Sequence, residues 1–114
     1  MGRPARHLGR AGKCLMELTP RQVFDRRNTL QLVDVRETEE VAGGMIPGAQ
    51  HIALGSVPDR HDELDRTRPI VVVCRSGRRS AAAAEHLTQA GFRADTMTGG
   101  MRDWQAVGLP VTTA

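Results

Sequence analysis

The chain has 114 residues, which is the length of a single domain, and its formal net charge is +3. A chain of this length buries roughly 65% of its unfolded surface, so a core can form without disulfides or a structural metal. Two cysteines, Cys14 and Cys74, are too few for a disulfide framework and are typical of a reducing compartment. There is no apolar run of about 18 residues that could span a membrane, and no secretory signal follows the basic N-terminus. We therefore expect a cytoplasmic protein that does not bind membranes.

The positive charge is concentrated before the first acidic residue, Glu17. Four of the 16 basic residues lie there, which leaves 12 basic against 13 acidic residues in the rest of the chain. The chain has two phenylalanines, one tryptophan and no tyrosine, so few side chains could stack on nucleic-acid bases. These features argue against a nucleic-acid partner. They predict a basic, flexible extension over residues 1–17, followed by one domain over residues 18–112.

Predicted helices and strands alternate along this domain. Thr19-Pro20 is a typical helix start. The expected helices lie at 19–28, 37–41, 57–64, 80–90 and 101–107, and the expected strands at 30–35, 51–54, 70–73 and 92–97. In the helix at 80–90, the spacing of Ala81, Ala84, Leu87 and Thr88 predicts the face that is buried against the sheet. The alternation predicts an α/β fold with a central parallel sheet and helices on both faces.

The most informative stretch is the loop after the expected strand at 70–73. Cys74 ends the strand, the polar and basic segment Arg75-Ser76-Gly77-Arg78-Arg79-Ser80 follows, and an alanine-rich helix comes next. Successive loop amides and a helix start favour negative charge, and three arginines add to this effect. Such surroundings lower the pKa of a cysteine thiol from about 8.5 into the range of roughly 3.5–7.5. An inert cysteine would instead have apolar neighbours, so the pattern favours Cys74 as a nucleophile.

Several short motifs occur in a characteristic order along the chain. They are Leu32-Val33-Asp34-Val35-Arg36-Glu37, Ile46-Pro47-Gly48-Ala49, the loop from Cys74 to Ser80, Gly91-Phe92, Gly99-Gly100 with Trp104, and Gly108-Leu109-Pro110. In this order and spacing the chain resembles the single-domain rhodaneses, which are thiosulfate-type sulfurtransferases, over about residues 18–112. Met45 stands where the family often has histidine, and Val41 stands where it usually has an aromatic residue. Both departures are expected to affect packing more than chemistry.

The resemblance implies a rhodanese-like fold and a mechanism in which Cys74 carries a sulfur atom as a persulfide. It implies that the loop backbone forms the substrate cradle, at Arg75, Ser76, Gly77, Arg78 and Arg79. The implied donor is a small anion such as thiosulfate, and the acceptor is cyanide or a thiol, which could belong to a partner protein. No cofactor is expected. A thiolate that is already ionised needs no general base, which agrees with the absence of histidine near Cys74 in the sequence.

Three alternatives remain open on the same fold. A cysteine phosphatase uses a Cys-x5-Arg loop, whereas Arg79 gives Cys-x4-Arg here, a shorter loop that suits a persulfide better than a phosphoryl group. An arsenate-reductase-like enzyme would need a resolving thiol, for which Cys14 is the only candidate. A non-enzymatic interaction or regulatory module is the third alternative, and the presence of Cys74 argues against it.

The remaining polar candidates are expected to support the loop. Asp34 and Arg36 lie two positions apart at a strand end and are expected to pair with each other or with loop backbone. Ser80 is expected to support the loop from the start of the helix. Trp104 is expected in the core. No metal site is expected, because no ligand spacing relates the four histidines to one another or to a cysteine: His7, His51, His61 and His86.

Overall fold

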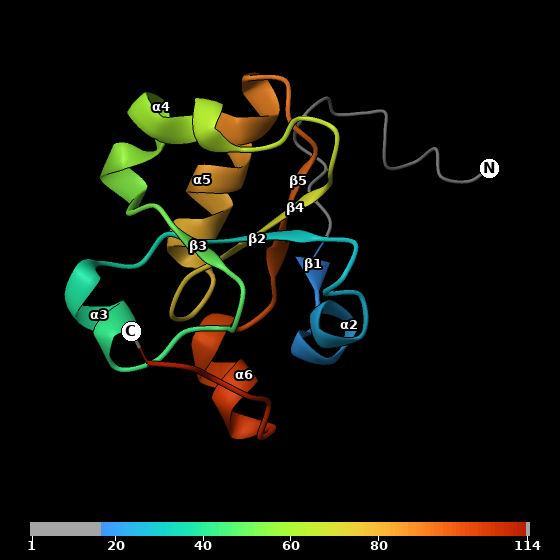
Figure 1. The fold of residues 1–114 in the computed structure, drawn as a ribbon, viewed down its shortest axis with the longest axis vertical. Helices are drawn as coiled ribbons and strands as arrows, with labels where there is room; N and C mark the ends of the chain where they lie inside the picture. The colour runs from blue at the N-terminus through green and yellow to red at the C-terminus, as the bar shows by residue number, and fades with distance from the viewer. Residues whose placement is uncertain (1–16, 114) are drawn as a thin grey trace.

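The computed structural model describes residues 17–113, and Figure 1 shows their fold. Five short parallel strands form one sheet with the order β1-β5-β4-β2-β3. The strands are β1 (Glu17–Leu18), β2 (Gln31–Asp34), β3 (Gln50–His51), β4 (Ile70–Val73) and β5 (Ala94–Met97). All side chains of the central strand β4 are buried, as expected for a parallel strand that is covered on both faces.

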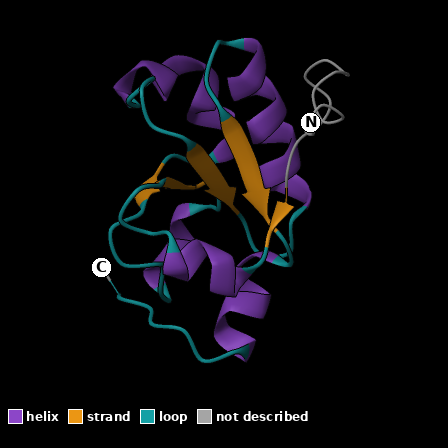
Figure 2. Cartoon of the chain, turned by 90° about the vertical axis from the view of Figure 1, so that its right-hand side faces the viewer, coloured by secondary structure: helices purple, strands orange, loops and turns teal. Residues whose placement is uncertain are grey.

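Helices cover both faces of the sheet (Figures 1 and 2). They are α2 (Pro20–Asp25), α3 (Thr38–Ala42), α4 (Val57–Arg60), α5 (Arg78–Gln89) and α6 (Gly100–Ala106), with two short 3₁₀ helices, η1 (Leu54–Ser56) and η2 (His61–Glu63), on either side of α4. The prediction of an α/β fold with a central parallel sheet is therefore confirmed.

The alternation of side chains along β4 divides the core into two apolar clusters. Ile70 and Val72 pack in the cluster on the α5 face of the sheet. Val71 and Val73 pack in the cluster that α2 and α6 complete on the other face. Cys74 continues the alternation of Ile70 and Val72 and belongs to the α5 cluster. The pattern of the strand therefore decides on which side of the sheet the cysteine lies.

Two strands differ from those that the sequence predicts. The strand β1 was not expected, because a two-residue strand carries no periodicity. It forms at the sheet edge, where Glu17 and Leu18 pair with β5. The strand expected at 51–54 is wrong in its position, because β3 is Gln50–His51 and the chain turns into η1 at Leu54. The other elements occur where expected, with ends that differ by a few residues.

The helix α5 starts earlier than expected, and its buried face is rotated from the predicted one, although Ala84 and Leu87 are buried as predicted. Gly77 precedes its first turn with a left-handed φ of +115°. The buried side chains are Ser80, Ala83, Ala84 and Leu87. The prediction that Ala81 faces the sheet is wrong, because Ala81 is exposed. A run of four alanines carries no polarity that would mark one face, so packing alone selects the buried positions.

Trp104 lies in the core, as predicted. Its side chain is fully buried, and its Nε1–H donates to the carbonyl oxygen of Pro110 over 2.8 Å. Its ring meets that of Phe24 edge-on, with ring centroids 6.2 Å apart. Because a buried indole N–H needs an acceptor, Trp104 holds the C-terminal segment against α6 while its ring packs against α2.

The start of α6 contacts the loop after β4 through backbone hydrogen bonds. The N–H of Met101 donates to the carbonyl oxygen of Cys74 over 2.8 Å, and the N–H of Arg102 donates to that of Arg75 over 3.0 Å. Gly100 precedes them with a φ of +59°. A Cβ atom on Gly100 would clash with the carbonyl groups of Cys74 and Arg75. Glycine is therefore required at this position for α6 to approach the loop so closely.

We expect Gly100→Ala to lower the free energy of unfolding by about 2–4 kcal/mol, because it combines a backbone clash with a left-handed φ. Urea titrations followed by the fluorescence of Trp104 provide the measurement. Gly55→Ala is the matched control, because Gly55 has open space around its Cβ position and no left-handed φ. The control should change stability by less than about 1 kcal/mol. Equal effects of the two substitutions would contradict the structural explanation.

Candidate active site

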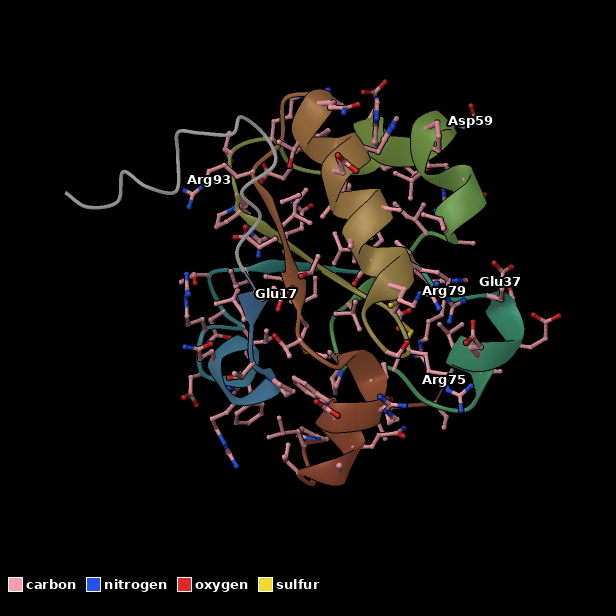
Figure 3. The ribbon with its side chains drawn as sticks, turned by 180° about the vertical axis from the view of Figure 1, so that it is seen from behind. Glu17, Glu37, Asp59, Arg75, Arg79 and Arg93 are labelled. Carbon is pink, nitrogen blue, oxygen red and sulfur yellow. The ribbon has the colours of Figure 1, made fainter. Side chains whose placement is uncertain are left out.

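The segment of residues 74–80, here called the active loop, follows β4 at the carboxyl edge of the sheet and includes the first turn of α5. Figure 3 shows Arg75 and Arg79 extending from this loop on the side of α3. Cys74 is 0% exposed, whereas Arg75, Ser76 and Arg78 are exposed. The loop backbone therefore lies between the cysteine and the solvent.

The sulfur of Cys74 is surrounded by hydrogen-bond donors. The backbone N–H of Gly77 donates to Sγ with an N–S distance of 2.9 Å. Burial raises the pKa of the Cys74 thiol, while hydrogen bonds from the Ser80 hydroxyl and from the backbones of Ser80, Gly77 and Ser76 lower it. The net pKa lies below the ordinary value of a thiol. Cys74 is therefore predisposed to form a thiolate, and the main cause is the loop hydrogen bonds.

Ser80 supports the active loop and also affects the electrostatics of the sulfur. Its side chain is fully buried, and its Oγ donates to the carbonyl oxygen of Gly77 over 3.1 Å. Its hydroxyl is also one of the groups that lower the thiol pKa of Cys74. A hydroxyl carries one hydrogen, so it donates either to Gly77 or to the sulfur, and a thiolate attracts it. Sequence reasoning missed this effect on the thiol because a serine near a helix start most often caps the backbone.

Arg79 joins the active loop to α3 through an ion pair with Glu40. The two guanidinium Nη atoms lie 2.7 and 2.8 Å from the two carboxylate oxygens. The hydrogen bonds with Glu40 are the largest cause that raises the pKa of Arg79, and attraction to the Cys74 thiolate raises it further. Arg79 thus favours the thiolate, but it is oriented by Glu40. Sequence reasoning missed Glu40, because the acidic helix shows no sign of a partner 39 residues away. Direct contact between Arg79 and a substrate stays a prediction.

Asp34 and Arg36 form a buried ion pair at the end of β2. Nη2 of Arg36 lies 2.8 Å from Oδ2 of Asp34 and donates to the carbonyl oxygen of Gly44 over 2.8 Å. The two residues therefore pair with each other, which is one of the two contacts that the sequence suggested. The pair also contacts the segment after α3 through Gly44, and the carbonyl oxygen of Arg36 lies 2.7 Å from Nε2 of His51 in β3. The pair thereby shapes the wall that faces the loop.

A pocket of about 360 Å³ opens beside the active loop. Its lining consists of Arg36, Glu40, Gly43, Gly44, Arg75, Met101, Arg102 and Gln105. The lining residues come from the loop, from the region of α3 and from α6. Sequence reasoning missed Arg102 and Gln105, because α6 meets the active loop only in the folded chain.

Residues 17–113 contain no group of three or more histidine, cysteine, aspartate and glutamate side chains that could hold a metal ion. No helix in the same range has the length and apolar character needed to cross a membrane. Cys14, the candidate for a resolving thiol, lies outside the described residues, as does His7.

The fold and the site together define an α/β domain that holds a buried cysteine, with a lowered thiol pKa, among loop amides. Residues 19–107 match the family model of the rhodanese-like domain. The chain is 44% identical over 81 residues to the putative sulfurtransferase YtwF of Bacillus subtilis, covering 71% of this chain and 79% of the relative. It is 38% identical over 92 residues to the thiosulfate sulfurtransferase GlpE of Pseudomonas aeruginosa, covering 79% and 84%.

The structural comparison leads to the same family. A rhodanese-related protein from Thermoplasma volcanium superposes with a TM-score of 0.83 at 28% identity, covering 86% of this chain and 98% of that chain. The chain belongs to the family of rhodanese-like domains, as the order of its motifs indicated.

Ser80→Ala is expected to raise the pKa of Cys74, because it removes a hydroxyl that stabilises the thiolate. The rate of alkylation by iodoacetamide as a function of pH, measured in a Cys14→Ser background, reports this pKa. Ser76→Ala is the matched control, because Ser76 contributes its backbone N–H, which alanine keeps. If Ser80→Ala leaves the alkylation profile unchanged, the role assigned to the hydroxyl is wrong.

A second prediction concerns acid stability. The hydrogen bond with Arg79 is the main cause that lowers the pKa of Glu40 from 4.5 to about 2. The pair therefore stabilises the folded chain above about pH 4.5, and this stabilisation is lost as the pH falls toward about 2. Because both side chains are partly exposed, we expect a contribution of only about 1 kcal/mol.

Glu40→Gln should lower the free energy of unfolding by this amount near neutral pH, and the difference from the wild type should disappear in acid. Urea titrations across the pH range measure it. Glu39→Gln changes an exposed carboxylate on the same helix and serves as the control. A destabilisation by Glu40→Gln that does not depend on pH would contradict the ion-pair explanation.

Proposed function

We propose that this protein is a sulfurtransferase that carries a sulfane sulfur on Cys74, with thiosulfate or a similar small anion as the donor. The observation that carries the proposal is the 2.9 Å hydrogen bond from the Gly77 N–H to the sulfur of Cys74, in a loop whose donors lower the thiol pKa. The thiolate is the form of cysteine that attacks sulfur. Relatives that are named sulfurtransferases support the same class of reaction.

The first half-reaction loads the cysteine. The Cys74 thiolate attacks the outer sulfur of thiosulfate, and a new sulfur–sulfur bond forms. The bond between the two sulfur atoms of the donor breaks, and sulfite leaves with the electron pair. Neither step requires a proton, so the reaction needs no general base.

The second half-reaction empties the cysteine. Cyanide or the thiolate of an acceptor attacks the outer sulfur of the persulfide. The sulfur–sulfur bond breaks, and the electron pair returns to the Cys74 thiolate. The same loop donors then stabilise the leaving thiolate, so one set of hydrogen bonds serves both half-reactions.

Access to the sulfur comes from the loop side. The opposite side of Cys74 is packed in the apolar α5 cluster. A persulfide places its outer sulfur about 2 Å from Sγ, toward the loop amides. The exposed side chains of Arg75 and Arg78 attract an anionic donor to the loop. Ser76 and Gly77 supply the N–H groups of the cradle.

Arg79 argues against the alternative that the protein is a cysteine phosphatase. In the sequence Arg79 stands five positions after Cys74, which makes the loop one residue shorter than a Cys-x5-Arg loop. In the structure both of its Nη atoms are bound by Glu40. An arginine that is occupied in this way is poorly placed to hold two oxygens of a phosphoryl group.

Treatment of the reduced protein with thiosulfate is expected to add one sulfur atom to Cys74, which intact mass spectrometry detects. Cys74→Ser should show no gain, because a hydroxyl is not ionised near neutral pH. Cys14→Ser should still load and serves as the control. Loading of the Cys74→Ser variant, or hydrolysis of an aryl phosphate by a wild type that never forms a persulfide, would overturn the proposal.

A further inference from the structure

We propose that the pocket beside the active loop binds the carboxylate of a small anionic thiol, and thereby selects carboxylate-bearing thiols as sulfur acceptors. This inference rests on the proposed function, because it assigns an acceptor to the Cys74 persulfide. The pocket volume of about 360 Å³ falls in the range of roughly 300–1,000 Å³ that is typical of small-molecule sites. A water molecule takes about 30 Å³, so the pocket accommodates a molecule much larger than a single sulfur atom.

The pocket lining has an excess of positive charge. Of its charged residues, Arg36 is neutralised by Asp34, and Glu40 is paired with Arg79. In the part of the chain that the structure describes, no carboxylate forms an ion pair with Arg75 or Arg102. Both of these arginines are exposed. Two exposed arginines without a carboxylate partner therefore line the pocket, which favours an anionic ligand.

The position of the pocket separates anion binding from the sulfur cradle. Arg75 directly follows Cys74, and its carbonyl oxygen accepts the N–H of Arg102 over 3.0 Å. Cys74 itself does not line the pocket. An anion held by Arg75 and Arg102 thus lies beside the reactive sulfur and not on it. A thiol anchored there by its carboxylate can extend its sulfur toward the active loop.

The chemistry of the lining specifies the ligand further. A guanidinium group matches a carboxylate through two parallel hydrogen bonds. Gln105 adds a side-chain amide that both donates and accepts, and Met101, which is 2% exposed, adds an apolar wall. This combination fits a short chain that carries a carboxylate and polar amide groups. Sulfur transfer then follows the second half-reaction: the acceptor thiolate becomes a persulfide, and Cys74 returns to a thiolate.

The test compares two acceptors on persulfide-loaded protein. 3-Mercaptopropionate carries a carboxylate, whereas 2-mercaptoethanol has a similar length and no charge. Arg102→Glu reverses one pocket charge, and a glutamate in the first turn suits the helix. Arg93→Glu makes the same change at an exposed arginine far from Arg75 (Figure 3). The measurement is the rate of single-turnover discharge at low acceptor concentration. Each thiol is compared with itself across the protein variants, so the difference in pKa between the two thiols does not affect the comparison.

We expect Arg102→Glu to slow discharge by 3-mercaptopropionate about tenfold, which corresponds to the loss of one charged hydrogen-bond contact. Discharge by 2-mercaptoethanol should change by less than about twofold, and Arg93→Glu should affect neither. An equal loss with both thiols would assign Arg102 to the general stability of the loop and overturn the inference. Slower loading from thiosulfate with unchanged discharge would assign the pocket to the donor and would also overturn it.

A binding measurement separates this inference from the proposed function. S-Methylglutathione carries carboxylates and amides but has no free thiol, so it binds without reacting. Titrated into unloaded protein, it should shift the backbone amide resonances of Gly44 and Gln105 in a saturable way, and Arg102→Glu should weaken this binding about tenfold. The absence of saturable shifts would overturn the inference even where Cys74 forms a persulfide. Saturable binding to a protein that never forms a persulfide would support the anion site and overturn the proposed function instead.

Discussion

The chemistry of this protein depends on the hydrogen bonds that backbone amides donate to a buried sulfur. A cysteine that is 0% exposed and packed in an apolar cluster would by itself keep its proton, because burial penalises the thiolate. The N–H of Gly77 at 2.9 Å, with the donors of Ser76 and Ser80, outweighs this penalty and places the thiol pKa below its ordinary value. These donors act only while they stay in place, so the geometry of one short loop decides whether Cys74 is reactive.

The rest of the structure holds that loop from three sides. α5 begins at Arg78 directly after the left-handed Gly77. α6 donates two backbone N–H groups to the loop, a contact that only glycine at position 100 allows. α3 is connected through the ion pair of Glu40 and Arg79. Because these contacts come from separate elements, the loop is fixed by the tertiary structure and not by its own sequence.

The arginines near the site have two different functions. Arg36 and Arg79 are paired with carboxylates. Arg36 joins the end of β2 to the segment after α3, and Arg79 joins the active loop to α3. Arg75 and Arg102 have no such pairing among residues 17–113 and line the pocket. The first pair contributes to rigidity, whereas the second leaves positive charge available to a ligand. The same side chain thus serves structure or recognition according to the carboxylates that the fold brings near it.

The sequence by itself determined the α/β class, the strand that ends in Cys74 and the family, because these depend on local periodicity and on motifs along the chain. It also indicated a lowered thiol pKa, since the loop amides and the helix start are local to Cys74. The tertiary structure alone decided that Arg79 is held by Glu40, that the buried Ser80 hydroxyl lowers the thiol pKa, and that Arg102 reaches the active loop. Each of these contacts depends on the packing of side chains or of elements. No spacing in the sequence records which carboxylate meets which arginine, or which face of an alanine-rich helix is buried.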